Sequence, residues 1–177
     1  MIPRVLLASA ALFVASSAIT AAHAGCKVEV VTDDFSGESK SVATGKFYDT
    51  LGKLEITKVG DQTTLTYPLF VYAGVDLPLP AENKVQFKLE DGKLLELSPT
   101  QLVAPEVVAW GATITTKWNA TFPVTDADVD ALAGSKVKAV NVPLVAEQSK
   151  VIDHAKGMHK LLAKSTQSMA ECVVKKR

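Results

Sequence analysis

The chain is poor in the residues from which catalytic and metal sites are most often built. It has three histidines and two cysteines among 177 residues, and one histidine, His23, lies in an N-terminal segment that we expect to be removed. No Gly-x-Ser-x-Gly motif, dinucleotide-binding fingerprint or glycine-rich phosphate loop occurs. These absences favour a protein that is not an enzyme and that holds neither a metal nor a cofactor.

The other two histidines, His154 and His159, lie five residues apart in a segment whose pattern predicts a helix. At about 100° per residue their side chains would diverge by about 140°, so they would not ligate one ion as an i, i+4 pair can. Asp126, Asp128 and Asp130 have the spacing of a calcium-loop start, but Ala131 stands where such a loop needs glycine. The sequence therefore predicts no metal site.

Charge is nearly absent from the first 24 residues, where Arg4 is the only charged side chain. A long apolar run follows it, and Ala22-His23-Ala24 has the small-x-small pattern of a signal peptidase site. We expect residues 1–24 to be a signal peptide and residues 25–177 to form one exported domain, periplasmic or extracellular. No later run approaches the roughly 20 apolar residues of a membrane span.

The charges balance, with 19 Lys and Arg against 19 Asp and Glu. Such a chain has no overall basic character with which to attract nucleic acid. In an exported protein the two cysteines, Cys26 and Cys172, predict a disulfide that joins the first strand to the last turns of the final helix. Two free, buried cysteines are the alternative.

Apolar residues that alternate with polar ones predict β-strands along much of the chain. Strands are expected at 27–32, on either side of a Gly-Asp turn within 54–69, at 112–122 and at 136–142, and residues 39–45 form either a loop or a weak strand. Residues 84–97 predict a hairpin with a three-residue loop that ends at Gly92 and pairs Phe87 with Leu95.

Two helices complete the expected fold. Thr125 and Asp128 have the spacing of a capping box, and Gly134 ends the short helix that follows. The apolar stripe from Val151 through Met158 to Cys172 predicts a long amphipathic helix within 145–174. The fold class is therefore α+β: an antiparallel sheet of six to eight strands, flat or folded into a partial sandwich, with a short helix and a long C-terminal helix packed on the sheet.

These observations favour an exported, non-catalytic binding or envelope-associated module with an unknown protein or small-molecule partner. The alternative is a carrier of a small apolar ligand in a cavity between the sheet and the last helix, and a carboxylate-dependent hydrolase is a third hypothesis. For the carrier, the expected lining residues are large and apolar, although a filled core would use the same residues. They are Trp118, Phe122, Met158, Leu162 and Met169.

Overall fold

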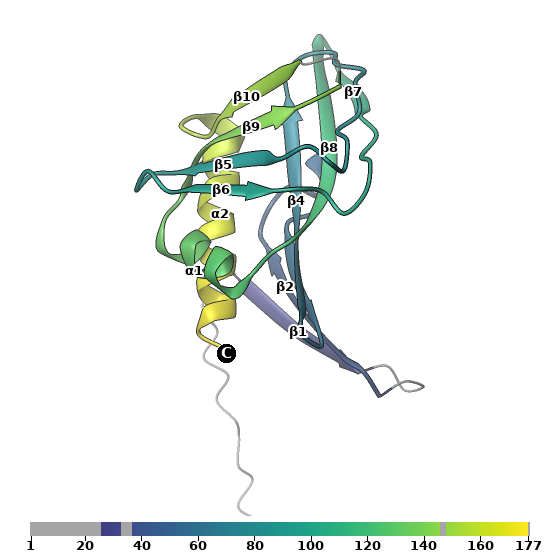
Figure 1. Ribbon diagram of the computed structural model, residues 1–177. Coiled ribbons are helices and arrows are strands. Elements are labelled where there is room, and N and C mark those ends of the chain that lie inside the picture. Colours follow the sequence, from purple (N-terminus) through teal and green to yellow (C-terminus); the bar gives the residue numbers. More distant parts are fainter. Residues whose placement is uncertain (1–25, 33–36, 146–147, 177) are drawn as a thin grey trace, which may run out of the picture.

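The computed structural model describes residues 26–32, 37–145 and 148–176, and it shows an α+β fold with two antiparallel sheets and two α-helices in that part of the chain (Figure 1). The elements in chain order are β1 (Cys26–Thr32), β2 (Ser39–Gly45), the 3-10 turn η1 (Asp49–Leu51), β3 (Glu55–Val59), β4 (Gln62–Val71), β5 (Val85–Leu89), β6 (Leu94–Leu97), β7 (Glu106–Trp110), β8 (Thr113–Pro123), α1 (Asp126–Gly134), β9 (Val137–Pro143), β10 (Ser149–Asp153) and α2 (Gly157–Val174).

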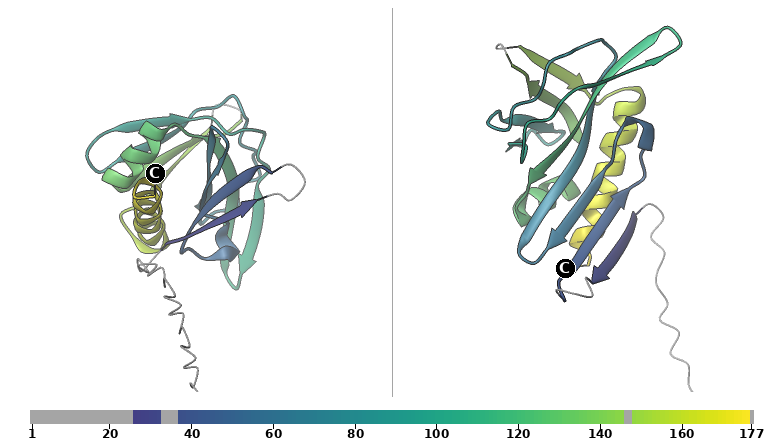
Figure 2. Two further views of the ribbon diagram at one scale, coloured as in Figure 1. Left: turned by 90° about the horizontal axis from the view of Figure 1, so that it is seen from below. Right: turned by 90° about the vertical axis from the view of Figure 1, so that its right-hand side faces the viewer.

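One sheet has six strands in the order β1-β2-β3-β4-β8-β7, and the other has four in the order β10-β9-β5-β6. The long helix α2 contacts both sheets, through β1, β2 and β3 on one side and β9 on the other, and it also packs against α1. Figure 2 shows α2 running along the six-stranded sheet, with α1 beside it. The helix therefore joins the two sheets through a shared core.

Aromatic side chains connect the two sheets in this core. Tyr67 of β4 packs edge-on against Phe87 of β5 with ring centroids 5.1 Å apart, and Phe87 packs edge-on against Phe122 of β8 at 5.6 Å. All three residues have no exposed surface. Because each ring buries a large apolar area, this cluster contributes strongly to the burial that stabilises the fold.

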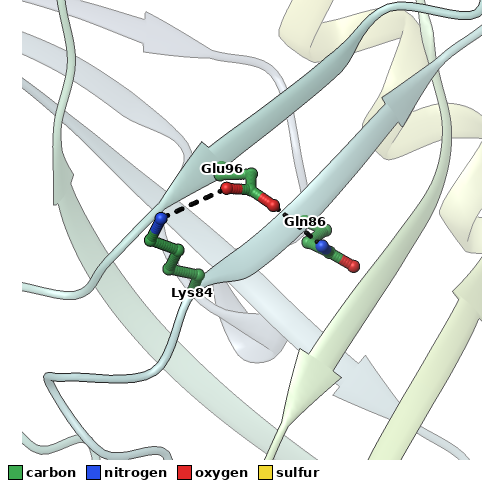
Figure 3. Close-up of polar contacts among 3 residues, drawn as sticks. All are labelled: Lys84, Gln86 and Glu96. Carbon is green, nitrogen blue, oxygen red and sulfur yellow. Dashed lines mark hydrogen bonds and ion pairs between the residues drawn. The ribbon is translucent and has the colours of Figure 1, made fainter.

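The hairpin of β5 and β6 has the register predicted from its turn. Phe87 pairs with Leu95 and Val85 with Leu97, while Gly92 adopts a φ of +92° that other residues rarely adopt. On the outer face Glu96 accepts hydrogen bonds from Gln86 Nε2 (2.9 Å) and Lys84 Nζ (3.3 Å) (Figure 3). These contacts lower the pKa of Glu96.

The short helix α1 begins with the predicted capping box. The Thr125 side chain accepts a hydrogen bond from the Asp128 backbone N–H (3.2 Å), and the Asp128 carboxylate accepts one from the Thr125 backbone N–H (2.9 Å). Each residue thus satisfies a backbone donor that the first helical turn leaves open.

The long helix starts later than the sequence pattern predicted. Residues 149–153 form strand β10, which pairs with β9, and α2 begins only at Gly157. Val151 is 72 % exposed on β10, and Ala155 lies exposed in the turn before α2. The prediction that Val151 and Ala155 lie on the buried face of this helix was therefore wrong, whereas Leu162 and Met169 are buried as expected.

Other predictions about strands were wrong or incomplete. The described residues contain ten strands rather than six to eight, because the sequence pattern did not predict β7 or β10. Residues 39–45, for which a loop and a weak strand were both left open, form strand β2, and the predicted strand at 136–142 is β9, which is followed by β10. The alternation within 27–32 also predicts that Val30 faces the core, and this was wrong, because Val30 of β1 is 68 % exposed.

The N-terminal segment expected to be a signal peptide lies outside the described residues, as do the side chains of Cys26 and Trp110. Within the described part, neither helix has the length and apolarity that a membrane crossing requires.

Candidate functional site

The candidate site lies where strand β4 continues beyond its pairing with β3. Strand β3 pairs only with Gln62–Thr66 of β4, whereas β8 pairs with β4 as far as Val71. The turn between β10 and α2, together with the first turn of α2, contacts the part of β4 that extends beyond β3. His154 and His159 come from these two turns and meet the rings of Tyr67 and Phe70.

His154 is held by hydrogen bonds to both of its ring nitrogens. Its Nδ1 lies 3.1 Å from the carbonyl oxygen of Ile152, and its Nε2 lies 2.9 Å from the hydroxyl of Tyr67. Because a carbonyl only accepts, Nδ1 carries the proton, and Nε2 accepts the hydrogen bond donated by Tyr67. The side chain is 3 % exposed, so the two buried polar groups satisfy each other.

His159 lies flat against Phe70, with ring centroids 4.0 Å apart and the planes tilted by 15°. Its ring centroid is 5.3 Å from that of His154. The predicted divergence of the two histidines was therefore wrong, because His154 lies in the turn before the helix and not on it. The His159 Nδ1 atom is buried without a hydrogen-bond partner among the described residues.

Burial keeps these groups uncharged near neutral pH. It lowers the pKa of His154 to about 4, with a further contribution from the nearby His159. Burial also lowers the pKa of His159, although the charge of Asp153 opposes this. For the Tyr67 hydroxyl, burial raises the pKa, and a smaller effect of the Thr166 side chain opposes the rise.

This neutral pair, in which His154 is buried and His159 half-buried, has a structural use. His154 fastens the β10–α2 turn to β4, and His159 fills the space beside Phe70. No cluster of three or more His, Cys, Asp or Glu side chains suited to a metal ion occurs in the described ranges.

A groove lies beside the β10–α2 turn, between the start of β9 and the first half of α2. Its volume is about 650 Å³. We call it the lysine groove, because four lysines line it. Its lining residues are Glu90, Lys136, Val137, Lys138, His154, Ala155, Lys160, Leu161, Ala163 and Lys164.

The strand wall of the lysine groove is fixed on both of its edges. The carbonyl oxygen of Lys136 accepts a hydrogen bond from the Glu90 N–H (2.9 Å), and that of Lys138 accepts one from the His154 N–H (2.9 Å). The same histidine therefore holds β4 through its ring and β9 through its backbone. This arrangement fixes the backbone of the β9 wall of the groove.

The helix wall is supported as well. Ala163 and Leu162 are 3 % and 1 % exposed and pack into the core, and the Gln167 side-chain amide donates a hydrogen bond to the Ala133 carbonyl of α1 (3.2 Å). Lys160 and Lys164 are exposed on the side of α2 that borders the groove.

The residues expected to line an apolar cavity lie in two places. Trp118, Phe122, Leu162 and Met169 are 0–1 % exposed in the core. Met158 is half-buried and lines a second, smaller groove of about 360 Å³. The other residues of this second groove are Thr50, Leu51, Tyr72, Val108, Thr113, Thr115 and Lys117.

The disulfide between Cys26 and Cys172 stays a prediction, because the Cys26 side chain lies outside the described residues. The arrangement of the backbone suits it. Helix α2, which carries Cys172, packs against β1, which begins at Cys26. No described cysteine is a free thiol.

Sequence reasoning missed the lysine groove, although its pattern is visible in the sequence. Lys136 and Lys138 alternate at the start of a predicted strand, and Lys160 and Lys164 are four apart on a predicted helix, so each pair shares a face. What the sequence does not tell is that the two faces meet. Comparison with known proteins adds no precedent, since no family model, curated protein or solved structure matches this chain.

Proposed function

We propose that this protein is an exported, non-catalytic binding module of the periplasm or cell envelope, and that it binds its partner in the lysine groove. The observation that carries the proposal is the groove itself. Its volume of about 650 Å³ is within the range of pockets that hold small molecules, and both of its walls belong to regular elements anchored in the core.

The polar groups beneath the groove support binding better than catalysis. The His154 ring is engaged at both nitrogens, so neither nitrogen is free to take a proton from a bound molecule unless a hydrogen bond breaks. A general base has to lie within hydrogen-bond reach of its substrate. His154 instead holds the wall in place.

A ligand screen with a groove-filling variant tests this function. Ala155 is exposed and lines the groove, so Ala155→Trp should fill part of it while leaving the core intact. We expect small molecules that raise the melting temperature of the wild-type protein to have little effect on this variant. Ala112→Trp, in the turn between β7 and β8, is the matched control, because Ala112 is exposed and does not line the groove.

Two results would contradict the proposal. One is turnover of a substrate by the purified protein in a broad hydrolase screen. The other is a set of ligands that stabilise the wild-type protein and Ala155→Trp equally, which would place binding outside the lysine groove.

Export and the disulfide belong to the same proposal. In a Gram-negative-type host we expect the protein in the periplasmic fraction, with a mass that corresponds to cleavage after Ala24 and to one disulfide. A full-length chain that stays in the cytoplasm would contradict the export proposal.

A carrier of a small apolar ligand is the second candidate, and the second groove favours it. Leu51, Tyr72, Val108 and Met158 give this groove an apolar lining. Nile red, a neutral apolar dye, should bind there and should bind several-fold more weakly to Met158→Lys. Equal binding by both proteins, or no binding, would remove this candidate.

A further inference from the structure

We propose that the ligand of the lysine groove is a small molecule with several negative charges, carried by phosphate or carboxylate groups. This inference rests on the proposed function and names the class of ligand. It draws on the charge, the placement and the surroundings of the four lysines.

The groove concentrates positive charge in a chain whose formal net charge is zero. Lysines and arginines balance aspartates and glutamates over the whole sequence, yet the groove has four lysines and Glu90 as its one acidic lining residue. Like charges around one concavity repel each other and raise the local positive potential. An anion bound between them would relieve that repulsion.

The ammonium groups of these lysines are available to a ligand. The ion pairs seen among the described residues join Lys84 to Glu96 and Lys117 to Glu106, and neither involves a lysine of the groove. All four groove lysines are exposed. A ligand would therefore not have to break an existing ion pair to bind them.

The lysines reach the groove from two directions. Lys136 directly precedes β9 and Lys138 is its second residue, and both are exposed on either side of the buried Val137, so they project from the same face. Lys160 and Lys164 are four residues apart on α2, so they share one face of the helix. Positive groups on opposite walls match a molecule with negative groups at more than one end, rather than one with a single charge.

The floor between the lysines is apolar and small. Val137 and Ala163 are buried there, and Leu161 is 49 % exposed at the rim. Side chains of this kind can contact the carbon skeleton of a ligand while the lysines bind its charged ends. A long nucleic acid is a poorer fit, because it would need a basic surface that extends well beyond one groove.

The backbone of the groove is already in place before a ligand arrives. The β9 wall is hydrogen-bonded on both edges, and α2 is anchored through its buried face. A site of this kind loses less conformational entropy on binding than a mobile one. The lysine side chains are then the main groups that must become ordered.

Calorimetric titration of the mature protein tests the proposal with two defined probes. Sodium tripolyphosphate presents several phosphate groups and citrate presents three carboxylates, so together they distinguish the two sources of negative charge. Trehalose and spermine serve as neutral and cationic controls. We expect at least one anion to bind, and to bind more weakly at 200 mM than at 20 mM salt, because salt screens exposed charges.

Two double variants, Lys136→Gln with Lys138→Gln and Lys160→Gln with Lys164→Gln, remove the charge of one wall at a time. For each lysine removed we expect binding about two- to fivefold weaker, as for exposed ion pairs. Because all four side chains are exposed, both variants should keep the far-ultraviolet circular dichroism of the wild-type protein.

Lys40→Gln combined with Lys58→Gln is the matched control, since both residues are exposed on strands outside the groove. Equal weakening by this control and by the groove variants would overturn the proposal and would indicate non-specific charge attraction. Failure of both anions to bind would overturn it as well.

The ligand screen with Ala155→Trp distinguishes failure of the inference about charge from failure of the proposed function. If neutral or cationic molecules bind in the groove and the anions do not, the inference about charge fails while the proposed function stands. If no ligand of any charge depends on the groove, both fail.

Discussion

Lowering the pH from 7.5 to 5 should destabilise the folded protein, mainly because His154 stays neutral inside it. Burial lowers the pKa of this imidazole from 6.5 to about 4. Below pH 6.5 the unfolded chain takes up a proton that the folded chain does not. The free energy of unfolding therefore falls as the pH falls through this window, and the loss is complete only below pH 4.

The size of the effect follows from the two pKa values. Their separation corresponds to about 3 kcal/mol for the whole window and to about 2 kcal/mol between pH 7.5 and pH 5. This is a large share of the 5–15 kcal/mol that is typical of a domain's total stability. His159, whose pKa is also lowered by burial, should add to the loss in the same direction.

Urea denaturation at several pH values measures this loss. The fluorescence of Trp118, which is 1 % exposed in the core, should report the transition. His154→Gln removes the titrating group, so its stability should depend less on pH between 6.5 and 5 than that of the wild-type protein. Carboxylates titrate in both proteins, and the difference between the two pH profiles therefore isolates His154 even if the variant is less stable at every pH.

His159→Gln is the matched control. It keeps the buried His154 and its hydrogen bond with Tyr67, so most of the pH dependence should remain. If wild-type protein and His154→Gln lose stability in parallel between pH 6.5 and 5, the reasoning from burial is refuted.

Three further predictions concern the framework. Thr125→Ala should cost about 1 kcal/mol in urea denaturation, because it removes the side chain of the α1 capping box, and an unchanged midpoint would contradict this. If Cys26 and Cys172 are paired, reduction of the mature protein should raise its intact mass by two hydrogens, and Cys172→Ser should lower its melting temperature. Free thiols before reduction would exclude the pairing. Met169→Ala should lower the free energy of unfolding by about 2–5 kcal/mol and Met158→Ala by about 1 kcal/mol or less, because only Met169 is fully buried. Equal losses in the two variants would contradict the difference in burial between the two methionines.

Local signals predicted the elements whose structure is decided within a few residues. The hairpin at Gly92 and the capping box at Thr125 both depend on short-range chemistry, so their register and position were correct. The long helix was misjudged at its start because Val151 happened to continue the helical spacing. What decides that segment is the pairing of β10 with β9, a contact that residue spacing does not reveal.

The candidate site depends on the same kind of non-local contact. The sequence showed two histidines and two pairs of lysines, but it placed His154 on the helix and so predicted that it points away from His159. In the structure the helix begins only at Gly157, so His154 lies in the turn before it, and the two imidazoles come together. It also brings Lys136 and Lys160, from different elements, to one groove.

The packing of β1 against α2 has a consequence for synthesis. Helix α2 follows all the other described elements in the chain, yet it completes the core that begins with β1. A chain emerging from the ribosome or a translocation channel can pair β1 with β2 early, but it lacks the helix that packs on β1 until its last residues have emerged. During that interval the surfaces of β1, β2, β3 and β9 that α2 contacts stay uncovered, so a chaperone that holds unfolded chains should delay aggregation most when chain release is slow.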